Sequence, residues 1–426
     1  RGDELAALQS RENGATIRIT GALHVGLSAA QLQYVAAIAQ AYEWETEGPR
    51  DRAGAGHGNR RPGADRCRRG AIVPWNIPLL TTVWKIGPPW RQATQWCSSP
   101  TSTLRCSHWS WPVSSTPPGC RPGVLNVVSG DGEPVGGSPF RAPPRVRKVA
   151  FTGSTAVGKS ILRQSADSVR RVTLELGGKG ANVILDDADI DMAVDGALFA
   201  CMANNGEACE AGTRLLIPSS RRDEIVDKLV ARASTLRLGD PLEPTTHVGP
   251  IISADQRDRI LDYFSIAADE GATIALGGRS PAGPGFEKGY WIEPTIFVDV
   301  TNDMRIAREE VFGPVLVVLT YDSVDDAVKI ANDTNYGLSA GVWGQRSPRS
   351  RGGPSPGRRD GVGEQLACDP PRLPVRRVQG ERPGPGGRAE RDRRVRRGEV
   401  HLDRPVGRYR EQGVRDRHRS GQLKVC

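Results

Sequence analysis

The sequence predicts an α/β fold with a mostly parallel sheet, and three observations support this. Strand-like and helix-like segments alternate from residue 148 to residue 345, which is the pattern of βαβ units. The length of 426 residues allows two or three domains with a core of ordinary size. Residues 151–160, FTGSTAVGKS, form a strand end, a Gly-containing turn and a helix start, an arrangement that presents backbone N–H groups to a phosphate.

Hydrophobic periodicity places the individual elements. Residues 1–44 predict helices, with the apolar side chains of 29–42 on one face, and residues 71–84 are again regularly patterned. The expected strands are 124–128, 149–151, 172–176, 182–185, 215–217, 272–276 and 315–320. One expected helix begins near residue 155, and the others cover 190–202, 222–234, 254–270 and 324–333.

Four stretches lack this periodicity and are compositionally atypical: 49–69, 88–122, 134–144 and 346–426. The last contains 21 Arg and one Lys among Pro, Gly and Ser, which is a disordered composition. A basic arm that binds nucleic acid is one interpretation of it, but phosphate-binding segments usually mix Lys with Arg and interleave aromatic residues. A non-native or unfolded tail is the interpretation we prefer.

The net charge of +9 is unevenly distributed along the chain. Residues 148–345 hold 29 acidic and 19 basic residues, so the positive charge lies outside the regularly patterned region. We therefore expect no nucleic-acid partner. No apolar run approaches the roughly 20 residues that span a bilayer, and the first residues lack a signal-peptide core. A cytoplasmic protein without a membrane partner is expected.

The eight cysteines do not show zinc or disulfide spacing, and we expect no metal. Only Cys201 and Cys209 lie in the patterned region. Cys209 lies in a turn with Gly206 and Gly212, small residues that let a substrate approach its sulfur. A nucleophilic thiol needs a lowered pKa or a base that takes its proton. Cys201, on the preceding helix, is interpreted as a buried inert thiol.

Residues 153–160 also fit the P-loop pattern of a nucleoside triphosphatase, with Gly153, Gly158, Lys159 and Ser160 at the required spacing. That alternative needs a second strand ending in a magnesium-binding aspartate. The pair that follows the strand at 182–185, Asp186 and Asp187, is the candidate.

Three motifs in one order favour a different assignment. VAFTGSTAVGKS, VTLELGGKGANVIL and NNGEACEAGTR together resemble the aldehyde dehydrogenase superfamily, including the spacing between Glu175 and Cys209. By that resemblance Cys209 is the nucleophile and Glu175 is the general base that activates water. Glu175 ends an apolar strand beside two glycines, where partial desolvation would raise its pKa. The segment IVPWNIPLL resembles another family motif, in which Asn76 donates to the developing oxyanion.

The same resemblance implies NAD or NADP as cofactor and a small aldehyde as substrate. EEVFGP at residues 309–314 matches the family segment in which Glu310 holds the nicotinamide ribose and Phe312 lies beside the nicotinamide. The other residues assigned to the cofactor site by resemblance are Gly153, Ser154, Trp75 and Leu176. The sequence does not distinguish NAD from NADP.

The implied architecture is aldehyde dehydrogenase-like, with a Rossmann-type cofactor domain and an α/β catalytic domain interrupted by the atypical segments. We expect the cofactor-binding domain at 1–176, the catalytic domain at 177–345, and the tail at 346–426 in place of the end of the catalytic domain. A homo-oligomer is implied by the family. The atypical stretches 49–69 and 401–426 coincide with the family's oligomerisation strands, however, so assembly is also in question.

Some departures from the family resemble changes of reading frame. Ser99 stands where the family has a cofactor-binding lysine. Residues 93–100 can be encoded so that a frame two nucleotides later gives NTVVLKP, and residues 362–380 so that the next frame gives YPFGGYK, both family-like segments. A third hypothesis is therefore an inactive, frame-shifted aldehyde dehydrogenase product.

Overall fold

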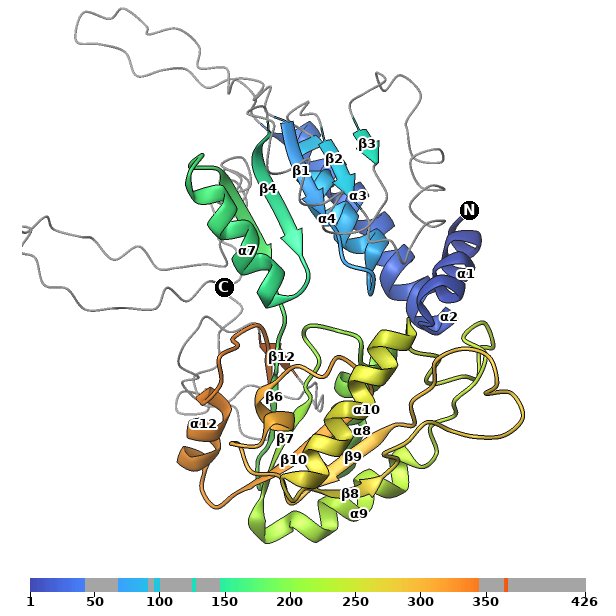
Figure 1. Ribbon diagram of the computed structural model, residues 1–426, viewed down its shortest axis with the longest axis vertical. Coiled ribbons are helices and arrows are strands. Elements are labelled where there is room, and N and C mark those ends of the chain that lie inside the picture. The colour runs from blue at the N-terminus through green and yellow to red at the C-terminus, as the bar shows by residue number, and fades with distance from the viewer. Residues whose placement is uncertain (43–67, 91–95, 100–124, 128–145, 345–363, 367–426) are drawn as a thin grey trace, which may run out of the picture.

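Two sheets organise the part of the chain that the structure describes. The computed structural model covers residues 1–42, 68–90, 96–99, 125–127, 146–344 and 364–366. Figure 1 shows the sheets in separate lobes, with β1 to β4 in the upper lobe and β6 to β10 in the lower one. Both sheets are mainly parallel and carry helices, so the predicted α/β class is confirmed.

The first sheet has five parallel strands in the order β3-β2-β1-β4-β5. Helix α4 follows β1, and α7 connects β4 to β5. Ala71, Leu79, Val83 and Ile86 form the apolar contact between β1 and α4. The bounds are β1 (Arg68–Ile72), α4 (Pro78–Trp90), β2 (Trp96–Ser99), β3 (Leu125–Val127), β4 (Val146–Thr152), α7 (Thr155–Ala166) and β5 (Arg171–Glu175).

The second sheet has seven strands in the order β12-β11-β6-β7-β10-β9-β8, and only its two edge pairs are antiparallel. Its strands are β6 (Ala181–Ile184), β7 (Arg214–Pro218), β8 (Thr273–Leu276), β9 (Thr295–Val298), β10 (Val315–Tyr321), β11 (Ala340–Trp343) and β12 (Glu364–Leu366). Its helices are α8 (Ile190–Met202), α9 (Arg222–Ala233), α10 (Ala254–Asp269), α11 (Arg305–Arg308) and α12 (Val324–Asn332).

Helices cover both faces of this second sheet. Alternate residues of β10 contribute to two different apolar clusters, Val317 to one and Val318 to the other. Ile260 of α10 belongs to the first cluster, and Ile225 of α9 to the second. Central strands buried on both faces need continuous apolar runs, and VLVVLTY in β10 is such a run.

The amino-terminal helices, α1 (Gly2–Asn13), α2 (Ile17–Ile19), the π-helical turn η1 (Thr20–Gly26) and α3 (Leu27–Ala41), are held by buried polar contacts. Ser10 and Thr20 share a 2.8 Å hydrogen bond between their hydroxyls, and His24 Nδ1 lies 3.1 Å from Gln9 Oε1. Asn13 Nδ2 donates to the backbone oxygen of Asn76 at 2.9 Å. These helices therefore brace the segment between β1 and α4.

The helical stretch from residue 17 to residue 41 has the length and mean hydropathy of a membrane span. Our expectation concerned unbroken apolar runs, and polar residues such as Arg18 and His24 interrupt this stretch, so the absence of a membrane partner stays a prediction. Length and composition are weak evidence of a span, since core helices meet the same test. Within this stretch His24 and Ser28 are buried polar side chains.

Most predicted elements in the patterned region are confirmed, α8 with both of its bounds. Five strands were missed among the described residues: β1, β2, β9, β11 and β12. β1 contains RRGAI, which has little strand character, and it forms because β2 and β4 flank it in the ladder. The atypical stretches lie almost wholly outside the described residues.

Candidate active site

The loops that connect the two sheets bring the predicted catalytic residues close to one another. Glu175 is the last residue of β5, and the chain then crosses to β6. A Cβ on Gly178, in this crossing, would lie 2.2 Å from the backbone oxygen of Cys209. Only glycine permits this approach, so the GG that follows LEL is needed for contact with the nucleophile loop.

A left-handed turn, η3 (Ala203–Gly206), precedes the predicted nucleophile. Asn204 and Asn205 have φ values of 54° and 59°, which asparagine tolerates better than most residues. Asn205 fixes the turn by donating to Pro250 O at 3.0 Å and accepting from Gly249 N at 2.8 Å. The NNG sequence therefore sets the direction in which the chain enters the nucleophile loop.

Asn76 reaches this loop from the first lobe. Its side chain is 5% exposed, and its Nδ2 donates to the backbone oxygen of Glu207 at 2.8 Å. An amide nitrogen carries two hydrogens, so the second can be donated to a substrate oxygen. The structure thus places a side-chain donor two residues from Cys209, as the proposed oxyanion role requires.

Cys209 is half-buried, and its Sγ donates to Glu210 Oε2 at 3.1 Å. Burial raises the pKa of the Cys209 thiol well above its ordinary value, and the charge and hydrogen bond of Glu210 raise it further. Glu310 and Glu175 contribute smaller shifts in the same direction. The thiol is therefore protonated at neutral pH and needs a proton acceptor before it can attack.

Glu175 reaches solvent, but the surrounding protein removes enough water to raise the pKa of its carboxyl. The positive charge of Lys85 opposes that shift. Lys85, on α4, donates to Thr152 Oγ1 at the end of β4. Burial lowers the pKa of Lys85 to about 8, although the charges of Glu175 and Cys209 act against the effect of burial. An ammonium group therefore lies near both predicted catalytic residues.

Lys85 should set the lower pH limit of activity. A base works only when ionised, so activity should fall as pH decreases through the raised pKa of Glu175. Lys85→Met removes the charge that lowers this pKa, and we expect the acid limb of the profile of kcat against pH to move to higher pH. Lys85→Arg keeps the charge and should leave the limb closer to its original position. An unmoved limb in Lys85→Met would exclude this coupling.

Gly153, Ser154 and Leu176 meet around the start of α7. Ser154 caps the helix by accepting from Val157 N, and Gly153 N donates to Glu175 O at 3.1 Å. Leu176 packs against Gly158, where a Cβ would lie 2.4 Å from Leu176 Cδ2. The helix terminus is suited to an anionic group.

A second group of predicted cofactor residues consists of Glu310, which contacts the segment between β5 and β6, and the aromatic pair Phe312 and Trp75. Glu310 Oε1 accepts from Gly178 N at 2.9 Å, and burial raises the pKa of its carboxyl. A Cβ on Gly177 would lie 2.3 Å from Glu310 Oε2, so this carboxylate occupies a cradle that only glycine leaves open. Phe312 packs edge-on against Trp75, with ring centroids 5.1 Å apart. The carboxylate and the aromatic pair fit the predicted ribose and nicotinamide contacts.

The P-loop alternative is wrong for this fold. Lys159 lies on α7, which follows β4 in the first sheet, whereas Asp186 and Asp187 follow β6 in the second sheet. A P-loop site takes its phosphate loop and its magnesium ligand from strands of one sheet. The FTGSTAVGKS turn therefore lacks the partner that the alternative needs.

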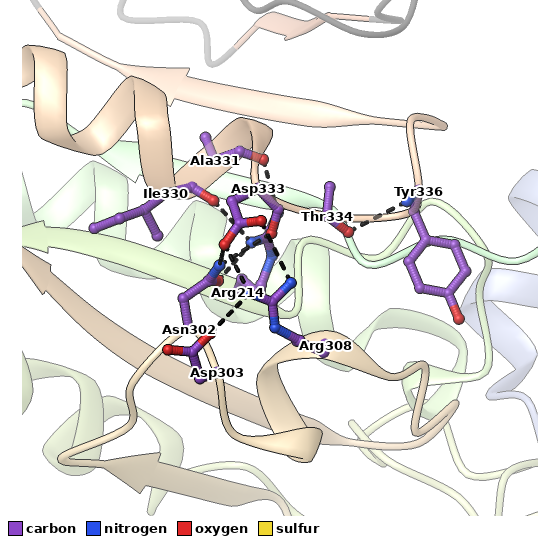
Figure 2. Close-up of polar contacts among 9 residues, drawn as sticks. All are labelled: Arg214, Asn302, Asp303, Arg308, Ile330, Ala331, Asp333, Thr334 and Tyr336. Atoms are coloured by element: carbon purple, nitrogen blue, oxygen red, sulfur yellow. Dashed lines mark hydrogen bonds and ion pairs between the residues drawn. The ribbon is translucent and has the colours of Figure 1, made fainter. Parts of the chain in front are cut away.

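A cluster around Arg214 anchors the segment that approaches the nucleophile loop from the second lobe. Figure 2 shows Arg214 directed at the end of α12, where it donates to Ile330 O at 3.1 Å and to Ala331 O at 2.9 Å, and to Asn302 Oδ1 at 2.9 Å. Asp333 joins the cluster through Arg308 Nη2 at 2.7 Å and Asn302 Nδ2 at 2.8 Å. The chain then continues to Ser339, whose hydroxyl donates to Glu210 O at 2.9 Å.

Arg214→Met should destabilise the fold strongly. Arg214 is 1% exposed, and its loss leaves buried carbonyls without donors, at about 3 to 5 kcal/mol. Arg232→Met, which removes a solvent-exposed pair with Asp195, should change stability very little. Urea unfolding of the two variants measures the difference. Equal midpoints would show that the cluster does not support the fold.

Three residues that the sequence interpretation did not single out act on the predicted site: Glu207 and Glu210 by hydrogen bonds, and Lys85 through its charge. A lysine within the apolar stretch TTVWKIG was a signal for Lys85. The two glutamates flank the cysteine in GEACEAG, but their contacts depend on side-chain direction, which the motif does not specify.

Similar sequences agree with this arrangement. Residues 1–351 match the aldehyde dehydrogenase family. The chain is 43% identical to a chloroplastic betaine aldehyde dehydrogenase of Beta vulgaris, over 64% of this chain and 54% of that protein. It is 38% identical to a geranial dehydrogenase of Castellaniella defragrans, over 80% and 70% respectively. The chain spans about half the length of the first of these relatives.

Solved structures lead to the same family. A putative aldehyde dehydrogenase from Burkholderia cenocepacia has a TM-score of 0.76 and 37% identity, covering 82% of this chain and 70% of that one. The NAD+ complex of a Bacillus cereus aldehyde dehydrogenase has a TM-score of 0.74 and 36% identity, covering 81% and 68%. The family match extends over most of the chain. The chain belongs to the aldehyde dehydrogenase family.

Proposed function

We propose that this protein oxidises an aldehyde to a carboxylic acid, with NAD+ or NADP+ as hydride acceptor. The observation that carries the proposal is the hydrogen bond from Asn76 Nδ2 to Glu207 O, which brings an oxyanion donor to the loop of the nucleophilic cysteine. Relatives named for betaine aldehyde and for geranial are both similar to this chain. The proposal is therefore confined to aldehydes as a class.

In the proposed mechanism the sulfur of Cys209 adds to the aldehyde carbon. Asn76 donates a hydrogen bond to the resulting oxyanion, with the Cys209 backbone N–H as second donor. The bound cofactor supplies the hydride acceptor, and a thioester then remains on Cys209. Glu175 removes a proton from water, the hydroxide attacks the thioester, and the carboxylate leaves.

The residues at the cofactor side support NAD or NADP as the acceptor. Glu310 would hold ribose hydroxyls, because its carboxylate is oriented by Gly178 N and lies over Gly177. Phe312 and Trp75 offer an aromatic edge to the nicotinamide, and Ser154 and Gly153 lie at the α7 terminus for the phosphates. The predicted cytoplasmic location and homo-oligomeric state stay predictions.

The direct test is aldehyde-dependent formation of the reduced cofactor, followed by its absorbance. We expect reduction of NAD+ or NADP+ and no hydrolysis of ATP. Asn76→Ala should lower kcat by about 10²- to 10³-fold, because one oxyanion donor is lost. Thermal unfolding of the variant controls for misfolding. The proposal fails if the folded protein reduces neither cofactor, or if Asn76→Ala keeps full turnover.

An inactive, frame-shifted product stays the second candidate, since the family match ends at residue 351, close to the start of the Arg-rich tail. The segments from which we infer the shift lie outside the described residues, apart from β2 and β12. The nucleotide sequence tests the frame shift directly. A neighbouring reading frame that encodes the missing family segments would support it, and the absence of such segments from every frame would exclude it.

A further inference from the structure

The thiol of Cys209 is hydrogen bonded to the residue that follows it, not to the predicted general base. Its Sγ donates to Glu210 Oε2 at 3.1 Å. Among the described residues Glu175 makes no hydrogen bond to this sulfur, and its charge has a smaller effect on the thiol than that of Glu210. Glu210 therefore contacts the thiol directly, whereas Glu175 affects it only through its charge.

The backbone around this contact is fixed from two sides. Ser339 donates its hydroxyl to Glu210 O at 2.9 Å, and Gly178 lies directly against Cys209 O. The Glu210 oxygen is thus held by a hydrogen bond, and the Cys209 oxygen packs closely against a segment outside the nucleophile loop. These contacts restrict the backbone on which the Cys209 and Glu210 side chains meet.

A base for the thiol has to be in contact with it. General-base catalysis requires hydrogen-bond reach between the base and the proton that it removes. Glu210 meets this requirement directly, whereas Glu175 makes no hydrogen bond to the sulfur and would need a water between them. Glu210 is also only half-buried, so a proton that it accepts can pass to solvent.

We propose that Glu210 is the catalytic base for the first step, taking the proton of Cys209 as the sulfur attacks, and that Glu175 serves only the later hydrolysis. The S–H bond breaks and its proton binds Glu210 Oε2. The sulfur electron pair forms the bond to the carbonyl carbon, and the carbonyl π pair moves to the oxygen that Asn76 binds. This inference rests on the proposed function of the site.

The first test is a burst of reduced cofactor on mixing enzyme with aldehyde. Glu210→Gln should slow the burst about 10²-fold or more at neutral pH, with the rate recovering as pH rises. Glu210→Asp keeps a carboxylate and should restore part of the rate. Glu175→Gln should keep the burst and lose steady-state turnover. A normal burst in Glu210→Gln, or loss of the burst in Glu175→Gln, would overturn the proposal.

Alkylation of Cys209 by iodoacetamide, measured without cofactor or aldehyde, separates this inference from the proposed function. With Glu210 as base, alkylation should proceed at neutral pH in the unsubstituted chain and become proportional to hydroxide concentration in Glu210→Gln. Faster alkylation of Glu210→Gln at neutral pH would show instead that Glu210 only keeps the thiol protonated. If the unsubstituted chain shows no burst, the proposed function fails and this assay still tests Glu210.

Discussion

Replacing Cys209 by Ala is expected to abolish aldehyde oxidation, with kcat reduced by about 10⁴-fold or more. No other described residue at the site offers a thiol, since Cys201 is fully buried in the core of the second lobe. The expected loss concerns the first chemical step, so the burst of reduced cofactor should disappear together with steady-state turnover. Rapid-mixing absorbance measures both.

Cys201→Ala is the matched control for this variant. Cys201 has no exposed surface, and burial raises the pKa of its thiol to about 12. Its truncation should cost some stability through the cavity that it leaves, and it should keep the burst. Full activity in Cys209→Ala, or loss of activity confined to Cys201→Ala, would show that Cys209 is not the nucleophile.

Glu175→Gln is expected to lower steady-state turnover by about 10²- to 10⁴-fold, the usual contribution of a general base. Because glutamine cannot take a proton from water, the thioester should accumulate after one hydride transfer, and the burst should equal the concentration of active sites. The control is Glu309→Gln, since Glu309 is held by Tyr263 and Arg305. A proportional loss of burst and turnover in Glu175→Gln would give this residue an earlier role.

Local sequence was sufficient to predict the fold class and most elements of the second lobe. β10 could be predicted because five consecutive apolar residues, VLVVL, form the run that a strand covered on both faces requires. The LELGG crossing was associated with the nucleophile through its resemblance to the family motifs, and the structure gives the physical reason, since Gly178 lies against Cys209 O.

Long-range pairing explains what the sequence could not provide. β1 contains two arginines and a glycine, and its strand exists through its register with β2 and β4. Lys85 was missed because its partner Thr152 lies 67 residues further along the chain. The contact between Cys209 and Glu210 is local in sequence, but whether neighbouring side chains meet depends on rotamers and on the clamp from Ser339.

Intact-protein and peptide mass spectrometry of Glu175→Gln, mixed with an aldehyde and NAD+ or NADP+, tests the central claim most directly. We predict that the protein gains the mass of one acyl group, that this mass is found on the peptide containing Cys209, and that hydroxylamine removes it, as expected of a thioester. An acyl group on a different residue, or reduced cofactor formed with no covalent adduct at any time, would contradict the account.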